Sequence, residues 1–236
     1  MTKGKLYLIP APLGEGDPAE VIPAAVLSTA CRLDCFVVEE LRTARRYLSR
    51  AGLKGSIDQL EFHTLNEHTT PAEVRALLPL FEDGRDVGYL SEAGLPAVAD
   101  PGAALVELCH EAGITVVPLS GPSSLLLALM GSGLNGQSFA FRGYLPIKEA
   151  ERAKAIRELE KQSAALSQTQ IFIETPYRND ALFTQLLKGL SPATRLCIAA
   201  DLTLPTQTLL TRTVSDWRRK PLSIGKRPCV FLILAR

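Results

Sequence analysis

The sequence VGYLSEAGLPAVADPG, residues 87–102, decides the fold class of this chain. It begins with an apolar run, 87–90, of the length of a buried strand, and a helical pattern starts after Pro101 and Gly102. A strand, a small-residue loop and a helix start leave backbone N–H and C=O groups free at the carboxyl end of a parallel strand, where open α/β proteins bind ligands. The stretch therefore predicts a ligand loop. The alternative is a strand-to-helix turn that binds nothing.

The first half of the chain repeats this pattern. Short apolar runs predict strands at 5–10, 35–38, 59–64, 87–90 and 114–119, and helical spacing predicts helices at 18–30, 42–51, 71–82 and 103–112. This alternation predicts a parallel sheet covered on both faces. Small-residue loops also follow the first and fifth strands, at 10–16 and 120–124, so three strand ends are expected to converge on one cleft.

The second half has a different organisation. Strands are predicted at 139–144, 170–174, 195–200, 207–213 and 229–234, with helices at 123–130, 147–166 and 177–190. Short links join the last three strands, with a brief helical stretch near Trp217, which predicts a mixed sheet with antiparallel pairs. Proline and glycine break the pattern at 118–122, so we expect an N-terminal α/β domain at 1–118 and a C-terminal α/β domain at 119–236.

Composition limits the classes of function. The 236 residues are 46% hydrophobic and 22% charged, which is typical of a globular protein, and the net charge of +1 gives no overall attraction to nucleic acid. RNA contacts would have to come from local basic clusters, of which one holds Arg42, Arg45, Arg46 and Arg50 and another holds Arg218, Arg219 and Lys220. The alternative for each cluster is a solvated helix face.

Cysteine and histidine usage predicts a cytoplasmic protein without a metal. The five cysteines are scattered and lie mostly in apolar runs, as reduced core residues do. His63, His68 and His110 are dispersed in the sequence, although folding could bring them together. No signal peptide or membrane-spanning run is recognised, so no membrane association is expected.

Four ordered motifs resemble one family. PAPLG follows the first strand, YLSEAGLPAVADPG contains the fourth, VPLSGPSS follows the fifth, and IETPYR lies in the second half. Together they are similar to the tetrapyrrole methylase superfamily, and within it to the ribosomal RNA small-subunit ribose 2′-O-methyltransferase I group. The resemblance covers residues 4–234. It implies a two-domain α/β fold that binds S-adenosylmethionine between its domains, usually as a homodimer, with ribosomal RNA or the small ribosomal subunit as partner.

The resemblance also implies a set of cofactor-binding residues. These are Leu13, Gly94, Leu95, Val98, Pro122, Ser123, Ile173, Glu174, Ala199, Ala200 and Pro228. The residue types suit the ligand, because its adenine and amino-acid ends need backbone donors and acceptors and small side chains that let the main chain approach. No GxGxxG follows the first strand, so a nicotinamide cofactor is not predicted.

The motifs expected to face the methyl acceptor depart from that group. EELR, residues 39–42, stands where the group has EDTR, SEAGLP stands for SDAGTP, and LNE, residues 65–67, stands for HNE. Two other classes therefore stay open. One is a methyltransferase for a tetrapyrrole or another small molecule, and the other is a protein that binds S-adenosylmethionine without catalysis.

The polar residues after the second predicted strand are candidates for chemistry. Transfer of a methyl group to a hydroxyl requires alignment of the acceptor oxygen and removal of its proton. We expect Glu40 to be the general base and Arg42 to hold a phosphate. The alternative is that Glu39 or Glu40 forms an ion pair with Arg42 that only fixes the loop.

Overall fold

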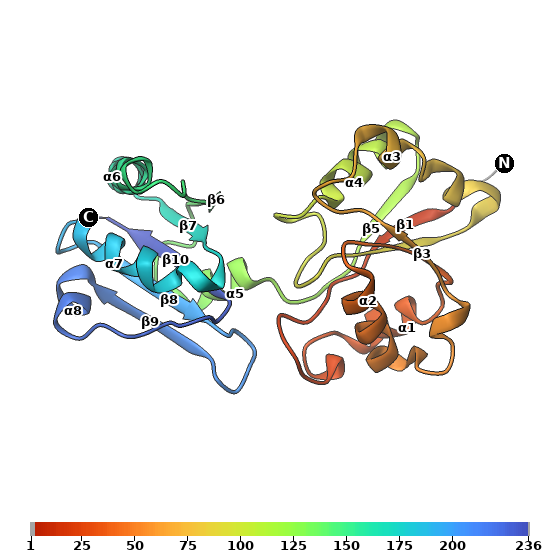
Figure 1. Cartoon of the computed structure of the whole chain (residues 1–236), viewed down its shortest axis with the longest axis horizontal. Coiled ribbons are helices and arrows are strands. Elements are labelled where there is room, and N and C mark those ends of the chain that lie inside the picture. The colour runs from red at the N-terminus through yellow and green to blue at the C-terminus, as the bar shows by residue number, and fades with distance from the viewer. Residues whose placement is uncertain (1–2, 236) are drawn as a thin grey trace. The chain divides into compact units, whose positions relative to one another are not determined.

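The computed structural model describes residues 3–235, which form two compact units (Figure 1). The first unit ends at Ser123 and the second begins at Ser124. The predicted division, between residues 118 and 119, stays a prediction about independent domains. The segment that follows residue 118 packs with the first unit, because the Leu119 N–H donates to the carbonyl of Leu8 at 3.1 Å.

The first unit is a five-stranded sheet in the order β3-β2-β4-β1-β5. Its strands are β1 (Lys5–Leu8), β2 (Cys35–Val38), β3 (Glu61–Thr64), β4 (Val87–Leu90) and β5 (Thr115–Pro118). Every neighbouring pair is parallel, so all five carboxyl ends lie at one edge. The predicted parallel sheet is confirmed.

Helices cover both faces of this sheet (Figure 1). They are α1 (Ala24–Ala30), α2 (Leu41–Leu48), α3 (Pro71–Arg75) and α4 (Gly102–Glu111), and α1 and α2 lie on the opposite face from α3 and α4. The residues of β2 alternate between two separate cores, since Phe36 packs into one and Val37 into the other. Burial on both faces explains why the strands read as continuous apolar runs.

Two of the predicted helices are shorter than expected because prolines interrupt them. The pattern at 18–30 forms a 3-10 turn, Pro18–Glu20, before α1, because Pro23 disfavours helical backbone in the residue before it. Asp17 caps this turn, since its carboxylate accepts from the Ala19 N–H at 2.9 Å. The pattern at 71–82 splits into α3 and a 3-10 segment, Leu78–Gly84, because Pro79 has no N–H to donate to the carbonyl of Arg75.

The second unit is a five-stranded sheet in the order β6-β7-β10-β8-β9. Its strands are β6 (Phe139–Tyr144), β7 (Thr169–Ile173), β8 (Arg195–Ala200), β9 (Thr208–Thr213) and β10 (Cys229–Leu234). Its helices are α5 (Ser124–Ser132), α6 (Glu149–Leu166), α7 (Asn179–Gly189) and α8 (Val214–Arg219). Strands β6 and β7 are parallel and the other pairs are antiparallel, which confirms the predicted mixed sheet.

Candidate functional site

Three loops of the first unit meet at the carboxyl edge of its sheet. Ala11, after β1, and Gly94, after β4, form a backbone bridge with N–H···O distances of 2.9 and 3.0 Å. Gly121, after β5, lies so close to the β1 loop that a Cβ there would be 2.2 Å from the Cβ of Pro10. Strands β4 and β5 both pair with β1, so parallel pairing itself brings these loops together.

Gly94 brings predicted cofactor residues from all three loops into contact. Its φ of +74° lies in the left-handed region, and a Cβ there would be 3.3 Å from Cδ2 of Leu13 and 3.6 Å from the carbonyl oxygen of Pro122. Ala97 and Ala99 in the same loop also have positive φ, 62° each, which costs a non-glycine residue about 1–3 kcal/mol. Gly94 is buried and its N–H and carbonyl both bond to Ala11, so the missing side chain lets the three loops pack closely at this point.

The other predicted residues of this unit flank the contact. Leu95 is partly buried, Val98 is exposed, and Ser123 is buried. The strained loop therefore presents apolar surface at Val98.

The predicted cofactor residues of the second unit lie at one end of its strands, where β7 and β8 end and β10 begins. Val230, near the start of β10, pairs with Ile173 at the end of β7 and with Ala199 near the end of β8, while Ala200 pairs with Cys229. The carbonyl of Pro228 accepts from the Asp201 N–H at 3.0 Å, which places Pro228 next to the end of β8. The site prediction thus corresponds to one group of residues in each unit.

Glu174, just after β7, has a buried side chain with fixed partners. One carboxylate oxygen accepts from Nε and Nη2 of Arg178 at 2.9 and 2.7 Å and from the Thr175 N–H at 2.7 Å. The other oxygen lies 3.8 Å from Nη1 of Arg152. Burial alone would raise the pKa of this carboxyl, but the hydrogen bonds from Arg178 and Thr175 lower it below its usual value. A cofactor contact at Glu174 would therefore come from its backbone.

The predicted base, Glu40, is the N-cap of α2. Its carboxylate accepts from the N–H groups of Arg42 at 3.0 Å and Thr43 at 2.6 Å. The backbone hydrogen bonds, from Thr43 first and Arg42 second, lower its pKa, which weakens it as a base at neutral pH. Across residues 3–235, no ion pair joins Arg42 to Glu39 or Glu40.

Glu39, the neighbour of Glu40, has the opposite environment. It is partly buried after β2 and accepts from the Glu92 N–H at 3.2 Å. Burial raises its pKa, and the negative charges of Asp100, Glu92 and Glu67 raise it further, against the lowering effect of the Glu92 N–H. A carboxyl with a raised pKa is the type of group that enzymes use as a general base near neutral pH.

Asp100 is a second carboxyl of this edge that sequence reasoning did not select. Its Oδ1 accepts from the Tyr89 hydroxyl at 3.0 Å and from the Gly102 N–H at 2.7 Å. Its Oδ2 is buried and has no hydrogen-bond partner among the described residues. Its position directly before Pro101 and Gly102, in the loop that opens the predicted ligand site, is the signal that could have identified it.

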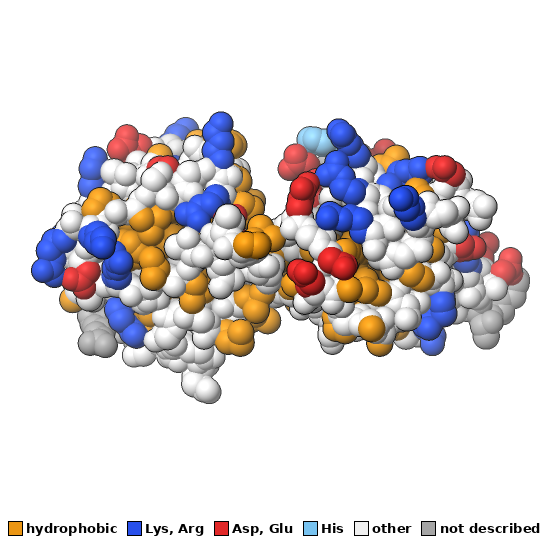
Figure 2. Space-filling view, turned by 90° about the horizontal axis from the view of Figure 1, so that it is seen from below, with side chains coloured by type: hydrophobic (Ala, Val, Ile, Leu, Met, Phe, Trp, Pro, Cys, Tyr) orange, Lys and Arg blue, Asp and Glu red, His pale blue; other side chains and the backbone are white. Residues whose placement is uncertain are grey.

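Basic side chains gather on one face of the first unit (Figure 2). On α2, Arg46 pairs with Glu15 at 3.5 Å, and Arg45 pairs with Asp58. Arg42 is exposed at the start of the helix, and no ion pair within the described part of the chain involves it. Arg42 is thus the cation at this sheet edge that is open to a phosphate.

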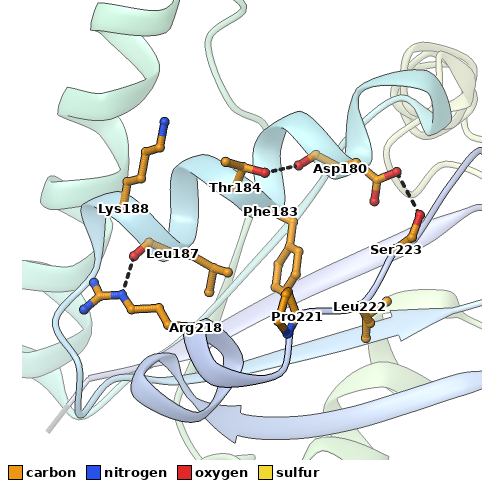
Figure 3. A pocket seen from close by; sticks show the side chains of 9 residues that line it. All are labelled: Asp180, Phe183, Thr184, Leu187, Lys188, Arg218, Pro221, Leu222 and Ser223. Carbon is orange, nitrogen blue, oxygen red and sulfur yellow. Dashed lines mark hydrogen bonds between the residues drawn. The ribbon is translucent and has the colours of Figure 1, made fainter.

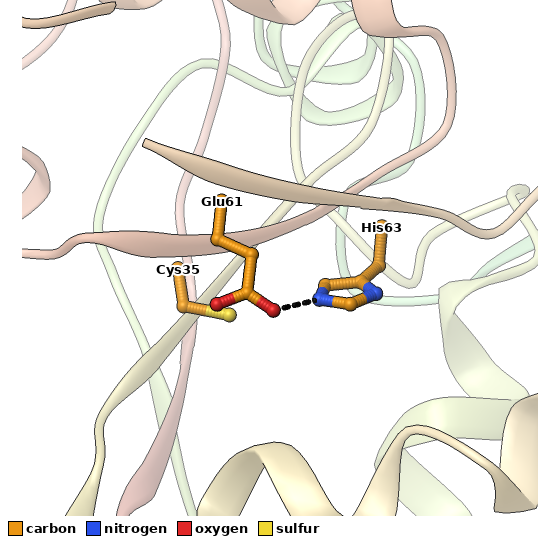
Figure 4. Close-up of side chains that lie close together, drawn as sticks. All are labelled: Cys35, Glu61 and His63. Atoms are coloured by element: carbon orange, nitrogen blue, oxygen red, sulfur yellow. Dashed lines mark hydrogen bonds and ion pairs between the residues drawn. The ribbon is translucent and has the colours of Figure 1, made fainter. Parts of the chain in front are cut away.

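One group of three side chains with metal-ligand chemistry lies on β2 and β3 (Figure 4). Ligand atoms of Cys35, Glu61 and His63 lie within 4.8 Å of one another. The Glu61 carboxylate accepts from Arg85 at 2.6 Å and is hydrogen-bonded to Nε2 of His63 at 2.8 Å. Burial raises the pKa of the Cys35 thiol to about 11. A cation would have to displace Arg85 from Glu61 and deprotonate the thiol, so the contacts fit an ion-pair network better than a metal site.

A pocket of about 640 Å³ lies in the second unit, between α7 and the segment around α8 (Figure 3). Phe183, Leu187 and Leu222 give it an apolar lining. Nε of Arg218 donates to the carbonyl of Leu187 at 2.8 Å, which ties the guanidinium to α7. None of the predicted cofactor residues lines this pocket.

The fold and the converging loops define an α/β protein of the kind that binds ligands at strand ends. A family model described as tetrapyrrole (corrin/porphyrin) methylases matches residues 5–217, and the chain belongs to this family of methyltransferases.

Similar proteins agree with this assignment. The chain is 31% identical, over 224 residues, to the ribosomal RNA small subunit methyltransferase I of Vibrio cholerae, covering 91% of this chain and 73% of that protein. It is 32% identical, over 213 residues, to the protein of the same name from Neisseria meningitidis serogroup B, covering 90% and 69%. The uroporphyrin-III C-methyl transferase of Thermus thermophilus, solved with S-adenosylhomocysteine, has the same fold, with a TM-score of 0.58, 18% identity and coverage of 98% of this chain and 97% of that one.

No helix within residues 3–235 is long and apolar enough to cross a membrane.

Proposed function

We propose that this protein transfers a methyl group from S-adenosylmethionine to a ribose 2′-hydroxyl of small-subunit ribosomal RNA. The close approach of Leu13, Gly94 and Pro122 is the observation that carries the cofactor assignment, because it gathers the loops after three strand ends around one strained loop. The names of the relatives from Vibrio and Neisseria favour RNA as the acceptor. At the carboxyl edge of the first sheet, Arg42 is an exposed cation that could hold a phosphate of the RNA. Glu39 lies at the same edge, and its raised pKa suits it to remove a proton.

The reaction follows from alignment and proton removal. When bound, S-adenosylmethionine supplies an electrophilic methyl carbon on a positively charged sulfur. The predicted cofactor residues would hold its ends through backbone groups, Arg42 would hold a phosphate next to the target ribose, and Glu39 would accept the 2′-hydroxyl proton. The sulfur leaves without charge, so we propose that no metal is needed. We also propose that the protein acts as a homodimer in the cytoplasm, where small subunits are assembled.

Methyl transfer to immature small subunits tests this function. Subunits from cells that lack the protein should accept label from S-adenosylmethionine, and digestion should place the label on a ribose. Subunits from cells that contain the protein are the control and should accept little label, because their site is already methylated. Labelling of a porphyrinoid but not of subunits would instead favour the tetrapyrrole alternative. Tight cofactor binding with no turnover on either acceptor would favour a protein that only binds the cofactor.

Arg42→Ala tests the phosphate contact. Loss of one phosphate ligand should lower turnover by about tenfold or more, which corresponds to about 1.4 kcal/mol in the barrier, while the affinity for S-adenosylmethionine stays unchanged. Arg50→Ala is the matched control, because Arg50 lies beyond the end of α2 and not at the sheet edge. Steady-state rates on immature subunits and calorimetric titration of the cofactor measure the two effects. Equal rates for wild type and Arg42→Ala would remove Arg42 from the acceptor site.

A further inference from the structure

Tyr177 is an exposed aromatic residue that carries a guanidinium on its ring. It lies in the 3-10 turn Pro176–Arg178 after β7, and 69% of its surface is exposed. Cζ of Arg178 lies 5.2 Å from the centre of the Tyr177 ring, within the range of a cation–π contact.

The guanidinium of Arg178 is held in place by the buried carboxylate of Glu174. Arg178 donates two hydrogen bonds to one oxygen of Glu174, whose side chain is fully buried, and Arg152 lies near the other oxygen. Two cations thus face one carboxylate, which leaves the cluster with net positive charge. A charge fixed by a buried partner has little rotamer freedom left to lose when it binds a ligand.

A second exposed aromatic residue stands at the same sheet edge. Tyr144 ends β6, is paired in register with Ile173 at the end of the parallel strand β7, and is 58% exposed. The hydrogen bonds to Glu174 raise the pKa of the Arg178 guanidinium, which therefore stays charged. Ile173 and Ala199, which we propose to contact the cofactor, lie at this end of the sheet as well.

We propose that Tyr177 and Arg178, together with Tyr144, form a base-stacking platform for single-stranded RNA. The platform rests on the proposed RNA acceptor and assigns to the second unit the contact with nucleotides that flank the target. Unstacked bases pack on tyrosine rings and on guanidinium planes, and the net positive charge of the cluster attracts phosphates. A platform beside the cofactor residues would hold an unpaired strand with its ribose near the methyl donor.

Binding of a short fluorescein-labelled single-stranded RNA, followed by anisotropy, tests the platform. Tyr177→Ala should weaken binding by about tenfold or more, as loss of a base–aromatic stack does, with little change in the salt dependence of the dissociation constant. Tyr177→Phe keeps the ring and should bind as wild type does. Phe139→Ala is the matched control, because Phe139 is also exposed, at 43%, but lies at the opposite end of β6.

The outcomes separate the platform from the proposed function. Wild-type affinity in Tyr177→Ala, or a wild-type protein that binds no RNA, would overturn the platform. If Tyr177→Ala keeps wild-type affinity while wild type methylates immature subunits, the function stands without the platform. If RNA binding depends on Tyr177 but subunits are never methylated, the platform stands and the proposed acceptor is wrong. Binding of a proline-rich peptide in preference to RNA would also contradict the proposal.

Discussion

Glu39→Gln is expected to lower turnover by at least about 100-fold, the lower end of what a positioned general base contributes. The amide keeps the shape of the side chain and an oxygen that can accept from the Glu92 N–H, but it cannot take a proton from the acceptor hydroxyl. Rates on immature subunits as a function of pH measure this directly. In the wild type the rate should fall as pH drops through the raised pKa of Glu39, and this acid limb should be absent from the variant.

The same substitution should stabilise the fold at neutral pH. The pKa of Glu39 is higher in the folded than in the unfolded protein, so the folded state binds more protons between the two values and stability falls as pH rises through them. Glu39→Gln has no carboxyl to ionise, so it should avoid this loss of stability at pH values above the folded-state pKa of Glu39. Below the unfolded-state pKa it should be about as stable as the wild type. Thermal unfolding at acidic and neutral pH should show the difference. A gain in stability together with a loss of turnover is the mark of a catalytic group held in an unfavourable state.

Glu40→Gln is the matched control and should behave in the opposite way. The pKa of Glu40 is lowered by hydrogen bonds to the N–H groups of Thr43 and Arg42, so its stabilising effect is present above the unfolded pKa and is lost as pH falls through the folded one. The variant should therefore be less stable at neutral pH while turnover stays close to wild type. Full activity in Glu39→Gln together with a large loss of activity in Glu40→Gln would show that Glu40, and not Glu39, is the general base.

The contrast between these neighbouring carboxylates shows where sequence reasoning ends. Hydrophobic spacing predicted both sheets, because buried strands and amphipathic helices leave periodic patterns. It did not predict that Glu40 would turn back to cap α2 while Glu39 would be partly buried next to Asp100 and Glu92. A capping role depends on the residue at which the helix begins, and helix ends are the part of a pattern that sequence determines least well.

Residues distant in sequence define the rest of the site. The EAGLP motif predicted a ligand loop, but the positive φ values of Ala97 and Ala99 carry no residue signal, since alanine rarely adopts this conformation. The contacts of Glu174 with Arg178 and Arg152 were not predicted, because Glu174 lies outside any helix and Arg152 is distant in the sequence. Packing of α6 against the sheet decides the contact with Arg152, and packing between elements is a tertiary effect.

Gly94→Val should abolish detectable binding of S-adenosylmethionine while the protein remains folded. A valine at this φ of +74° is strained, and its Cβ would press on Leu13 and approach the carbonyl of Pro122, which are the groups proposed to receive the cofactor. The Ala11 bridge on the other side of Gly94 hinders the loop from moving away. Isothermal titration with S-adenosylmethionine and S-adenosylhomocysteine measures the loss, and circular dichroism checks the fold.

Gly113→Val is the matched control that separates strain from contact. Gly113 lies just after α4 with a similar φ of +66°, and a Cβ there would meet no atom within 4 Å. Both variants should pay a similar cost for left-handed backbone, about 1–2 kcal/mol of stability for a residue with a Cβ, so their melting temperatures should fall together. Only Gly94→Val should lose the cofactor, because only its side chain enters the converging loops. Equal binding in Gly94→Val and wild type would show that these loops shape the fold without receiving the cofactor, and equal loss in both variants would trace the effect to strain alone.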